Sequence, residues 1–256
     1  MRLDIYLFQK KNVKSRQKAK ALIEEGNVKV NGQVILKPSF EIVNEQSIIE
    51  IVDNCPYVSR GGLKLEGVLK VTGISVADKV CIDIGSSTGG FTHCLLLNGA
   101  KRVYAIDSGT DQLAQQLKND KRVVSIENFN ARNLNQDTVK EKAYIITIDV
   151  SFISQNLIIP NIPQLLSEDG VFFSLIKPQF EVGRSLVGKG GIVKDKKSRH
   201  LAVKSVINCA KEFGLKCTKF LKSPIQGGDG NIEYLAAFSK QGDEICEEYI
   251  KKIVFE

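Results

Sequence analysis

Short apolar runs alternate with segments of helical spacing through the middle of the chain. The runs of strand length are 80–84, 103–106, 123–126, 144–150 and 171–176, and the helix-like segments between them are 89–97, 113–117 and 157–166. This alternation predicts a parallel sheet with helices on both faces. In such sheets, ligands bind at the carboxyl ends of the strands.

The end of the chain adds two strand-like runs, 215–221 and 232–238, joined by a connection rich in glycine and polar residues. Together they predict a hairpin that closes an otherwise parallel sheet. A closing hairpin is atypical of a dehydrogenase domain, and it resembles the seven-stranded sheet of Rossmann-like methyltransferases. We therefore expect an α/β fold of that kind for the larger part of the chain.

The first sixty residues have a different pattern. A short apolar helix is predicted from Leu3, and a second helix over 16–25, with Ser15 as its N-cap. Residues 28–30 alternate like a strand, Asn31-Gly32 is the dipeptide preferred in a tight hairpin turn, and 34–35 begin the return strand. These features predict a small, separate α+β unit.

Positive charge is concentrated in this unit. The whole chain has a net charge of +7, and its first twenty residues hold seven basic side chains against the single acid Asp4. The basic residues are Arg2, Lys10, Lys11, Lys14, Arg16, Lys18 and Lys20. A solvated helix face is the commoner meaning of such a run, but basic residues around a loop and a helix start also favour phosphate.

Sequence motifs make this unit more specific. The motifs are Arg2-Leu3-Asp4, Ser15-Arg16, Leu22-Ile23, Val28-x-Val30-Asn31-Gly32 and Lys37-Pro38. They resemble the S4 RNA-binding domain over residues 1 to about 50, which implies a structured RNA as partner and leaves the reaction open. The expected domains are 1–58, an S4 domain, and 59–256, an enzyme domain.

A glycine-rich loop follows the first strand of the larger domain, in Asp83-Ile84-Gly85-Ser86-Ser87-Thr88-Gly89-Gly90. A carboxylate at Asp83 would repel a pyrophosphate, but it could attract the ammonium and sulfonium of S-adenosylmethionine, directly or through water. Asp107 follows the next strand, where related folds place an acid that binds a ribose. The alternative is that the glycines make only a tight turn and that the acids cap helices.

Four charged residues stand beside apolar segments: Lys64, Asp149, Lys177 and Glu233. Taken singly, each is as well explained by a surface salt bridge. Taken together, they resemble the Lys-Asp-Lys-Glu tetrad of FtsJ-like ribose 2′-O-methyltransferases.

Longer motifs narrow the resemblance to one family. They are Ser59-Arg60-Gly61-Gly62-Leu63-Lys64-Leu65-Glu66, Glu127-x-x-Asn130-x-Arg132, Asp149-Val150-Ser151-Phe152-Ile153-Ser154, Lys177-Pro178-Gln179-Phe180-Glu181 and Gly230-Asn231-x-Glu233. The chain is similar to the TlyA (hemolysin A) family over nearly its whole length. Two departures are Ser86, where relatives often have alanine, and Asn128-Phe129, which replaces a more usual Arg-Thr pair and leaves the adenine contacts in that loop open.

The resemblance implies a methyltransferase that uses S-adenosyl-L-methionine to modify ribosomal RNA, at a cytidine ribose in characterised relatives, with ribosomal RNA or ribosomal subunits as partners. The implied cofactor-binding residues are Asp83, Gly85, Ser86, Ser87, Thr88, Gly89, Gly90, Asp107, Asn130 and Asp149. The expected RNA-binding residues are Lys10, Lys11, Lys14, Arg16, Lys18, Lys20, Arg60, Arg184 and Lys189.

Within the tetrad, Lys177 is the candidate base for the ribose hydroxyl. A lysine can serve as a base when burial or a nearby cation favours its neutral form, and Lys64 could supply that cation. Asp149 would orient Lys177, and Glu233 would steady Lys64 or the ribose. Residues 180–195 form a glycine-rich, charged connection that we expect to lack structure and to close over RNA.

Other classes of protein are less well supported. The six cysteines are scattered and only His93 and His200 are histidines, so we expect reduced thiols and no metal site. No apolar run is long enough to span a bilayer and no secretory signal is evident, so we expect a cytoplasmic protein that does not bind membranes. A monomer is expected, although the sequence leaves the oligomeric state open. The alternatives are a membrane-active, hemolysin-like protein and a non-catalytic RNA-binding protein. Methylation of DNA bases is disfavoured because Asp149-Val150-Ser151-Phe152 lacks the Asn/Asp-Pro-Pro-aromatic element used there.

Overall fold

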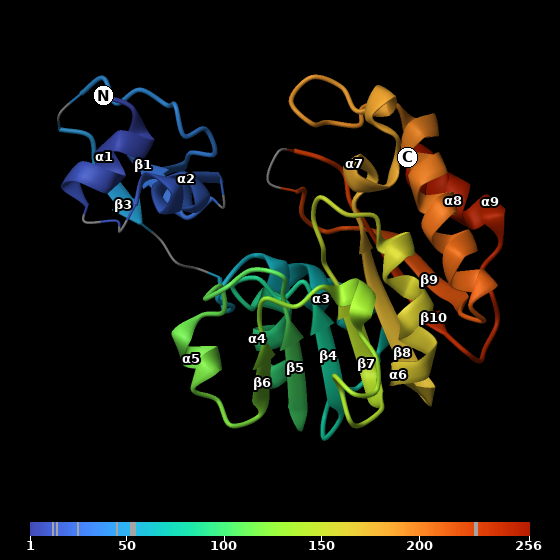
Figure 1. Cartoon of the computed structure of the whole chain (residues 1–256). Helices are drawn as coiled ribbons and strands as arrows, with labels where there is room; N and C mark the ends of the chain where they lie inside the picture. The colour runs from blue at the N-terminus through green and yellow to red at the C-terminus, as the bar shows by residue number, and fades with distance from the viewer. Residues whose placement is uncertain (12, 14, 25, 45, 52–54, 228–229) are drawn as a thin grey trace. The chain divides into compact units, whose positions relative to one another are not determined.

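The chain forms two compact units, Met1–Pro56 and Tyr57–Glu256 (Figure 1). The computed structural model describes all residues except 12, 14, 25, 45, 52–54 and 228–229. None of the helices made by the described residues is both long and apolar enough to cross a membrane.

The smaller unit packs two helices against a three-stranded antiparallel sheet. Its elements are α1 Leu3–Lys10, α2 Arg16–Glu24, β1 Val28–Val30, β2 Gln33–Val34 and β3 Ile49–Ile51, in the strand order β2-β1-β3. Its core is made by Leu3, Leu7, Ala19, Ile23, Val28, Val30 and Ile49. The predicted hairpin is confirmed, because Asn31 and Gly32 both have a positive φ, 51° and 80°, between β1 and β2. Strand β3 was not predicted.

The buried acid Asp4 links the start of α1 to the start of α2. Asp4 is fully buried, and its two carboxylate oxygens each lie 3.0 Å from an arginine Nε, one of Arg2 and one of Arg16. Burial acts to raise the pKa of Asp4, but the hydrogen bonds from Arg2 and Arg16 outweigh it and lower the pKa. Arg16, expected to bind RNA, therefore also contributes to the fold of this unit.

The larger unit is built around one seven-stranded sheet, as predicted from the sequence. Its strands are β4 Val80–Ile84, β5 Arg102–Ile106, β6 Val123–Ile126, β7 Ala143–Ile148, β8 Leu166–Ile176, β9 Lys216–Lys222 and β10 Tyr234–Ser239. The strand order is β6-β5-β4-β7-β8-β10-β9, and β10 is antiparallel to both of its neighbours. The closing hairpin, β9–β10, is thus confirmed.

Helices cover the sheet. They are α3 Gly61–Thr72, α4 Gly90–Leu97, α5 Gln115–Lys118, α6 Ile162–Leu165, α7 Pro178–Glu181, α8 Lys196–Glu212 and α9 Glu247–Phe255, with 3-10 turns η1 Ala131–Asn133, η2 Gln155–Leu157, η3 Ile159–Asn161 and η4 Arg184–Leu186. Figure 1 shows α8 and α9 side by side next to β9 and β10. Helix α8 begins where the Asp195 carboxylate accepts hydrogen bonds from the Ser198 amide and hydroxyl, both at 2.8 Å.

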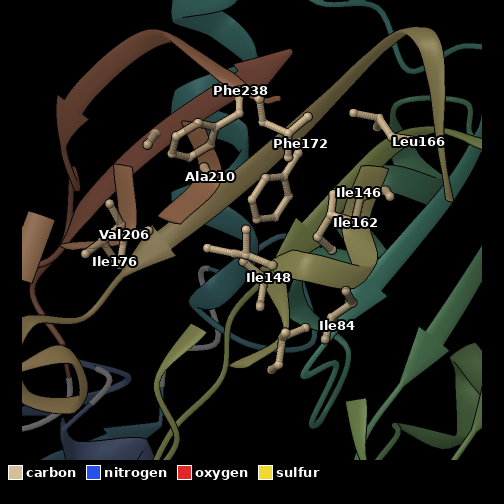
Figure 2. Close-up of a cluster of buried hydrophobic side chains, with 14 of the residues drawn as sticks. Ile84, Ile146, Ile148, Ile162, Leu166, Phe172, Ile176, Val206, Ala210 and Phe238 are labelled. Carbon is tan, nitrogen blue, oxygen red and sulfur yellow. The ribbon is translucent and has the colours of Figure 1, made fainter. Parts of the chain in front are cut away.

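The main core lies between the sheet and the helices α6 and α8. Figure 2 shows isoleucines of β4 and β7 beside Phe172 of β8, with Val206 and Ala210 contributed by α8. The rings of Phe172 and Phe238 stack with their centroids 5.5 Å apart. These side chains are buried, which explains why the central strands read as nearly continuous apolar runs.

Three expectations were wrong in detail. Residues 157–166 do not form one amphipathic helix, because Pro160 and Pro163 lack the amide hydrogen that a continuous helix needs, and the segment breaks into η3 and α6. Strand β8 begins at Leu166, five residues earlier than its apolar run. The connection from 180 to 195 is not without structure, since it contains the end of α7 and the turn η4.

Candidate active site

A pocket of about 290 Å³ lies at the carboxyl ends of β4, β5 and β7. Its polar lining is Ser87, Asp107, Ser108, Asn130, Asp149 and Ser151, and its apolar lining includes Ile106, Phe129, Val150, Phe152, Ile153 and Ile158. This is the edge of the sheet where a ligand was expected. The volume is near the lower end of the range for small-molecule sites.

Gly85 lets two strand ends approach each other closely below this pocket. Its φ is +83°, and a Cβ atom at this position would lie 2.4 Å from the Asp149 carbonyl oxygen. The Gly85 amide donates to the Ile106 carbonyl at 2.8 Å, and the Asp149 amide donates to the Ile84 carbonyl at 2.9 Å. Only glycine fits both the backbone angle and the space, so the chain after β7 can pack directly against this turn.

Asp107 is held in a fixed orientation at the wall of the pocket. One carboxylate oxygen accepts a hydrogen bond from the Ser87 amide and the other from the Gly109 amide, each at 2.7 Å. Every carboxylate oxygen can accept more than one hydrogen bond, so the group retains acceptor capacity toward the pocket. Such a carboxylate is suited to bind vicinal hydroxyls of a ribose.

Asp83 lies beneath the pocket rather than in its lining. It is fully buried, and its carboxylate accepts hydrogen bonds from the Thr92 amide at 2.9 Å, the Thr92 hydroxyl at 2.7 Å and the Thr147 hydroxyl at 2.9 Å. Burial raises its pKa to about 6, although these hydrogen bonds act in the opposite direction. Direct contact between Asp83 and a ligand is therefore not supported, and its contacts instead connect β4, β7 and the start of α4.

The rest of the glycine-rich loop shapes the helix that follows it. Ser86, Thr88, Gly89 and Gly90 are not part of the pocket lining. A Cβ at Gly89 would lie 2.2 Å from a Leu117 methyl carbon, and one at Gly90 would lie 2.3 Å from the Ser59 hydroxyl oxygen. These glycines are required for close packing around the N-terminus of α4.

The segment after β6 supplies another wall of the pocket. Asn130 caps η1 by accepting a hydrogen bond from the Arg132 amide at 3.1 Å. Phe129, one of the two departures from the family pattern, lines the pocket beside Asn130. An aromatic ring at this place can contact an adenine, so the departure leaves the pocket with a suitable surface.

Lys64 and Glu233 form a buried ion pair. Lys64 projects from α3, Glu233 directly precedes β10, and Lys64 Nζ lies 2.5 Å from Glu233 Oε2. Glu233 is 3% exposed, so removal of Lys64 would leave its carboxylate buried without an ion-pair partner. A Cβ at Gly227 would lie 2.5 Å from Glu233 Oε1, which shows that the preceding loop packs closely against the carboxylate.

Lys177 and Asp149 form the second pair. Lys177 follows β8, Asp149 follows β7, and Lys177 Nζ lies 2.5 Å from Asp149 Oδ1. The same ammonium donates a hydrogen bond to the Ser151 hydroxyl at 3.0 Å. Both partners remain partly exposed, at 12% and 20% for their side chains, and Asp149 lines the pocket.

The sheet register brings the two pairs to one edge. Tyr234 pairs with Ile176 in the antiparallel ladder of β10 and β8, so Glu233 and Lys177 are the next residues outward on neighbouring strands. In the parallel ladder Ile148 pairs with Ser174, which places Asp149 at this edge as well. The structure thus brings together the four charged residues that the sequence singled out, as two lysine–carboxylate pairs.

Most residues expected to bind RNA lie on the surface. Lys10, Lys11, Lys20, Arg184 and Lys189 are exposed, and Arg60 is half-buried just before α3. Lys14 lies outside the described residues, and Lys18 lies in α2. In the described part of the chain no group of three histidine, cysteine or acidic side chains is arranged to hold a metal ion, and no disulfide joins the cysteines.

Several residues around the site were not predicted from the sequence. Thr92 and Thr147 hold Asp83, Ser151 holds Lys177, and Glu181 binds the loop that follows β7. Phe152 is 92% exposed, has a φ of 63° and packs against Phe180 with ring centroids 5.1 Å apart. Ser151, Phe152, Phe180 and Glu181 lie within the family motifs of the sequence, but those motifs assigned them no role. Thr92 lies in α4 and Thr147 in β7, and no motif given above includes them.

Comparisons with known proteins agree with this fold. Residues 57–240 match the family model of FtsJ-like methyltransferases, and residues 1–46 match that of the S4 domain. The chain is therefore a methyltransferase of the FtsJ-like class that carries an S4 domain at its N-terminus.

Individual relatives identify the family of this chain within the FtsJ-like class. It is 46% identical to hemolysin A of Brachyspira hyodysenteriae over 93% of this chain and 99% of that protein. It is 39% identical to the 16S/23S rRNA (cytidine-2′-O)-methyltransferase TlyA of Mycobacterium tuberculosis over 94% and 91% of the two chains. A solved structure from Streptococcus thermophilus that carries the name hemolysin matches with a TM-score of 0.79 and 39% identity, covering 100% of this chain and 94% of that one. The chain belongs to the TlyA (hemolysin A) family.

Proposed function

We propose that this protein transfers a methyl group from S-adenosylmethionine to the 2′-hydroxyl of a ribose in ribosomal RNA, at a cytidine. The observation that carries the proposal is the pair of lysine–carboxylate contacts, Lys64–Glu233 and Lys177–Asp149, at the sheet edge beside a pocket. The TlyA relative of Mycobacterium tuberculosis is named as a methyltransferase of the same ribose position.

The residues of the pocket fit S-adenosylmethionine. Gly85 lines the pocket without a side chain, Asp107 presents an oriented carboxylate for the ribose, and Phe129 and Ile158 give an apolar surface for the adenine. Asp149 places a negative charge in the lining, where it can attract the positively charged methionine end. When bound, the cofactor supplies an electrophilic methyl group on its sulfonium.

The chain's own groups then act on the ribose hydroxyl. A protonated hydroxyl is a poor nucleophile, and Lys177 Nζ is the group that takes its proton. Asp149 and Ser151 hold Nζ at the pocket wall, and Glu233 holds Lys64 as a second cation at the same edge.

The RNA partner is expected to contact the exposed groups near this edge. Phe152 offers an exposed ring at the pocket rim on which a base can stack, and such stacking does not depend on sequence. Arg184 and Lys189 are exposed and can bind backbone phosphates, as can the lysines of the S4 domain.

The test uses the full chain, labelled S-adenosylmethionine and ribosomal subunits from cells that lack the gene. We expect Lys177→Ala to lower methyl transfer at neutral pH by about 10²-fold or more, the usual contribution of a general base, while cofactor affinity changes little. The control is Lys101→Ala, an exposed lysine just before β5 at the opposite edge of the sheet, which should leave transfer unchanged. Mass spectrometry of the RNA identifies the nucleotide.

Other outcomes would change the assignment. Wild-type transfer by Lys177→Ala would show that another group is the base. Binding of RNA without cofactor binding or transfer by the wild type would indicate a non-catalytic RNA-binding protein. Replacement of Arg184 and Lys189 together by alanine should weaken RNA binding, and an unchanged RNA affinity would contradict their proposed role.

A further inference from the structure

We propose that Glu181 is a positioning residue for methyl transfer. It holds the loop that carries Asp149 and Ser151 against the helical turn that follows Lys177, and so keeps the Lys177 ammonium between these two partners. The inference rests on the proposed function, because it concerns how the candidate base is oriented.

Glu181 makes two separate contacts with the loop after β7. One carboxylate oxygen accepts a hydrogen bond from the Ser154 hydroxyl at 2.6 Å, and the other accepts one from the Gln155 amide at 3.0 Å. Ser154 is also the N-cap of η2, where its hydroxyl oxygen accepts a hydrogen bond from the Asn156 amide at 3.2 Å. The carboxylate thus restrains two consecutive residues at the point where the loop turns into η2.

Lys177 and Glu181 lie at the two ends of one short helical turn. The Phe180 amide donates to the Lys177 carbonyl at 3.0 Å, and the Val182 amide donates to the Pro178 carbonyl at 3.1 Å, which closes α7. Lys177 contacts the beginning of the loop after β7 through Asp149 and Ser151. Glu181 contacts the end of this loop through Ser154 and Gln155. The loop is therefore attached to α7 at both ends.

The side chain of Gln155 gives the same residue a second anchor that does not involve Glu181. The Gln155 side chain is 1% exposed, donates to the Leu175 carbonyl at 2.6 Å and accepts from the Ser174 hydroxyl at 2.6 Å. This anchor fixes the end of the loop to β8 from within the core. Loss of Glu181 should consequently loosen the catalytic part of the loop without unfolding the strand below it.

A carboxylate at position 181 has a cost in desolvation free energy. Burial raises the pKa of Glu181, and no lysine or arginine of the described residues forms an ion pair with it. Glu181 is partly buried, and a carboxylate without a cation loses hydration there that its two hydrogen bonds must offset. What it provides is two strong acceptors in a fixed geometry, which two adjacent donors of the loop require.

Three variants separate positioning from general stability. Glu181→Ala removes both contacts. Glu181→Gln can keep both, because its amide oxygen can accept from the Gln155 amide while its NH₂ group donates to the Ser154 hydroxyl oxygen. Ser205→Ala is the matched control, since it removes the hydrogen bond from Asn156 Nδ2 to the Ser205 hydroxyl, 2.8 Å long, which joins the same turn to α8.

The experiment measures kcat, KM for ribosomal subunits, cofactor affinity and amide hydrogen exchange of residues 149–155 in the full chain. We expect Glu181→Ala to lower kcat by about 10²-fold, as misplacement of a catalytic group does, with KM and cofactor affinity within about threefold of wild type and faster exchange at the Gln155 amide. Glu181→Gln and Ser205→Ala should each keep kcat within roughly fivefold of wild type.

Equal kcat values for Glu181→Ala and Ser205→Ala would overturn the inference, and so would Glu181→Gln as impaired as Glu181→Ala. Absence of transfer by the wild-type chain would instead refute the proposed function. In that case hydrogen exchange still decides the structural part, because unchanged exchange at the Gln155 amide in Glu181→Ala would show that Glu181 does not hold the loop.

Discussion

Asp83 makes the stability of the larger unit depend on pH in a way that one substitution can isolate. Its buried carboxylate accepts three hydrogen bonds from Thr92 and Thr147 and has a pKa of about 6, against an ordinary value of 3.8. Asp83→Asn removes the titration and keeps the shape. The amide oxygen can face Thr92, the NH₂ group can donate to the Thr147 hydroxyl, and that hydroxyl can turn to the Ile82 carbonyl, 3.4 Å away.

The raised pKa determines the sign of the effect. A folded state that holds a proton more tightly than the unfolded state gains stability below the unfolded pKa, and it loses this gain as pH rises through the folded pKa. For Asp83 the gain is complete below pH 3.8 and is lost as pH rises to about 6 and beyond. The full shift corresponds to about 3 kcal/mol, of which about 1.4 kcal/mol is lost between pH 5 and pH 7.5.

The assay is urea unfolding of wild type and Asp83→Asn followed by circular dichroism, since the chain has no tryptophan. The free energy of unfolding of wild type minus that of the variant should fall by about 1.4 kcal/mol from pH 5 to pH 7.5. Other carboxylates titrate equally in both proteins and cancel in this difference. The exposed Asp243→Asn serves as the control for the loss of one charge. A difference that stays constant, or that rises with pH, would refute the account of Asp83 given above.

Two further substitutions test the geometry of the site. Gly85→Ala should destabilise the chain by about 2–5 kcal/mol and abolish cofactor binding, because it adds a clash with the Asp149 carbonyl to a strained φ. Gly73→Ala, with a φ of +68° and no atom within 4 Å of its Cβ, should cost only about 1–2 kcal/mol, and equal melting temperatures for the two variants would contradict this. Lys64→Met should cost about 3–5 kcal/mol because it leaves Glu233 buried without a cation, and addition of Glu233→Gln should recover most of the loss. Denaturant unfolding of Lys64→Met and of the double variant Lys64→Met/Glu233→Gln measures the loss of stability and its recovery. A double variant less stable than Lys64→Met would exclude this explanation.

The sheet was largely predictable because its central strands, β4 and β7 among them, are buried on both faces and its outer strands are still apolar runs. Strands β4 and β6 have the bounds expected from their apolar runs, and the closing hairpin was found from two such runs at the chain end. Helix α8 was not predicted, although Ala202, Val203, Val206 and Ile207 repeat at helical spacing and are buried in the structure. Strand β3 has only three residues, of which one is buried, so its sequence carries little periodic signal.

The sequence by itself determined the two-unit organisation, the parallel sheet with its closing hairpin, and the identity of the four charged residues, because periodicity and local motifs are properties of neighbouring positions. Only the tertiary structure decided which charges meet. Lys64 of α3 pairs with Glu233, which is 169 positions away and directly precedes β10, and Lys177 pairs with Asp149 through the register of β7 and β8. The tertiary structure also shows that Asp83 lies beneath the pocket, where the sequence had suggested a direct contact with the ligand, and it shows the contacts of Glu181. Burial and hydrogen-bond geometry depend on residues that are distant in the chain, and no local pattern encodes them.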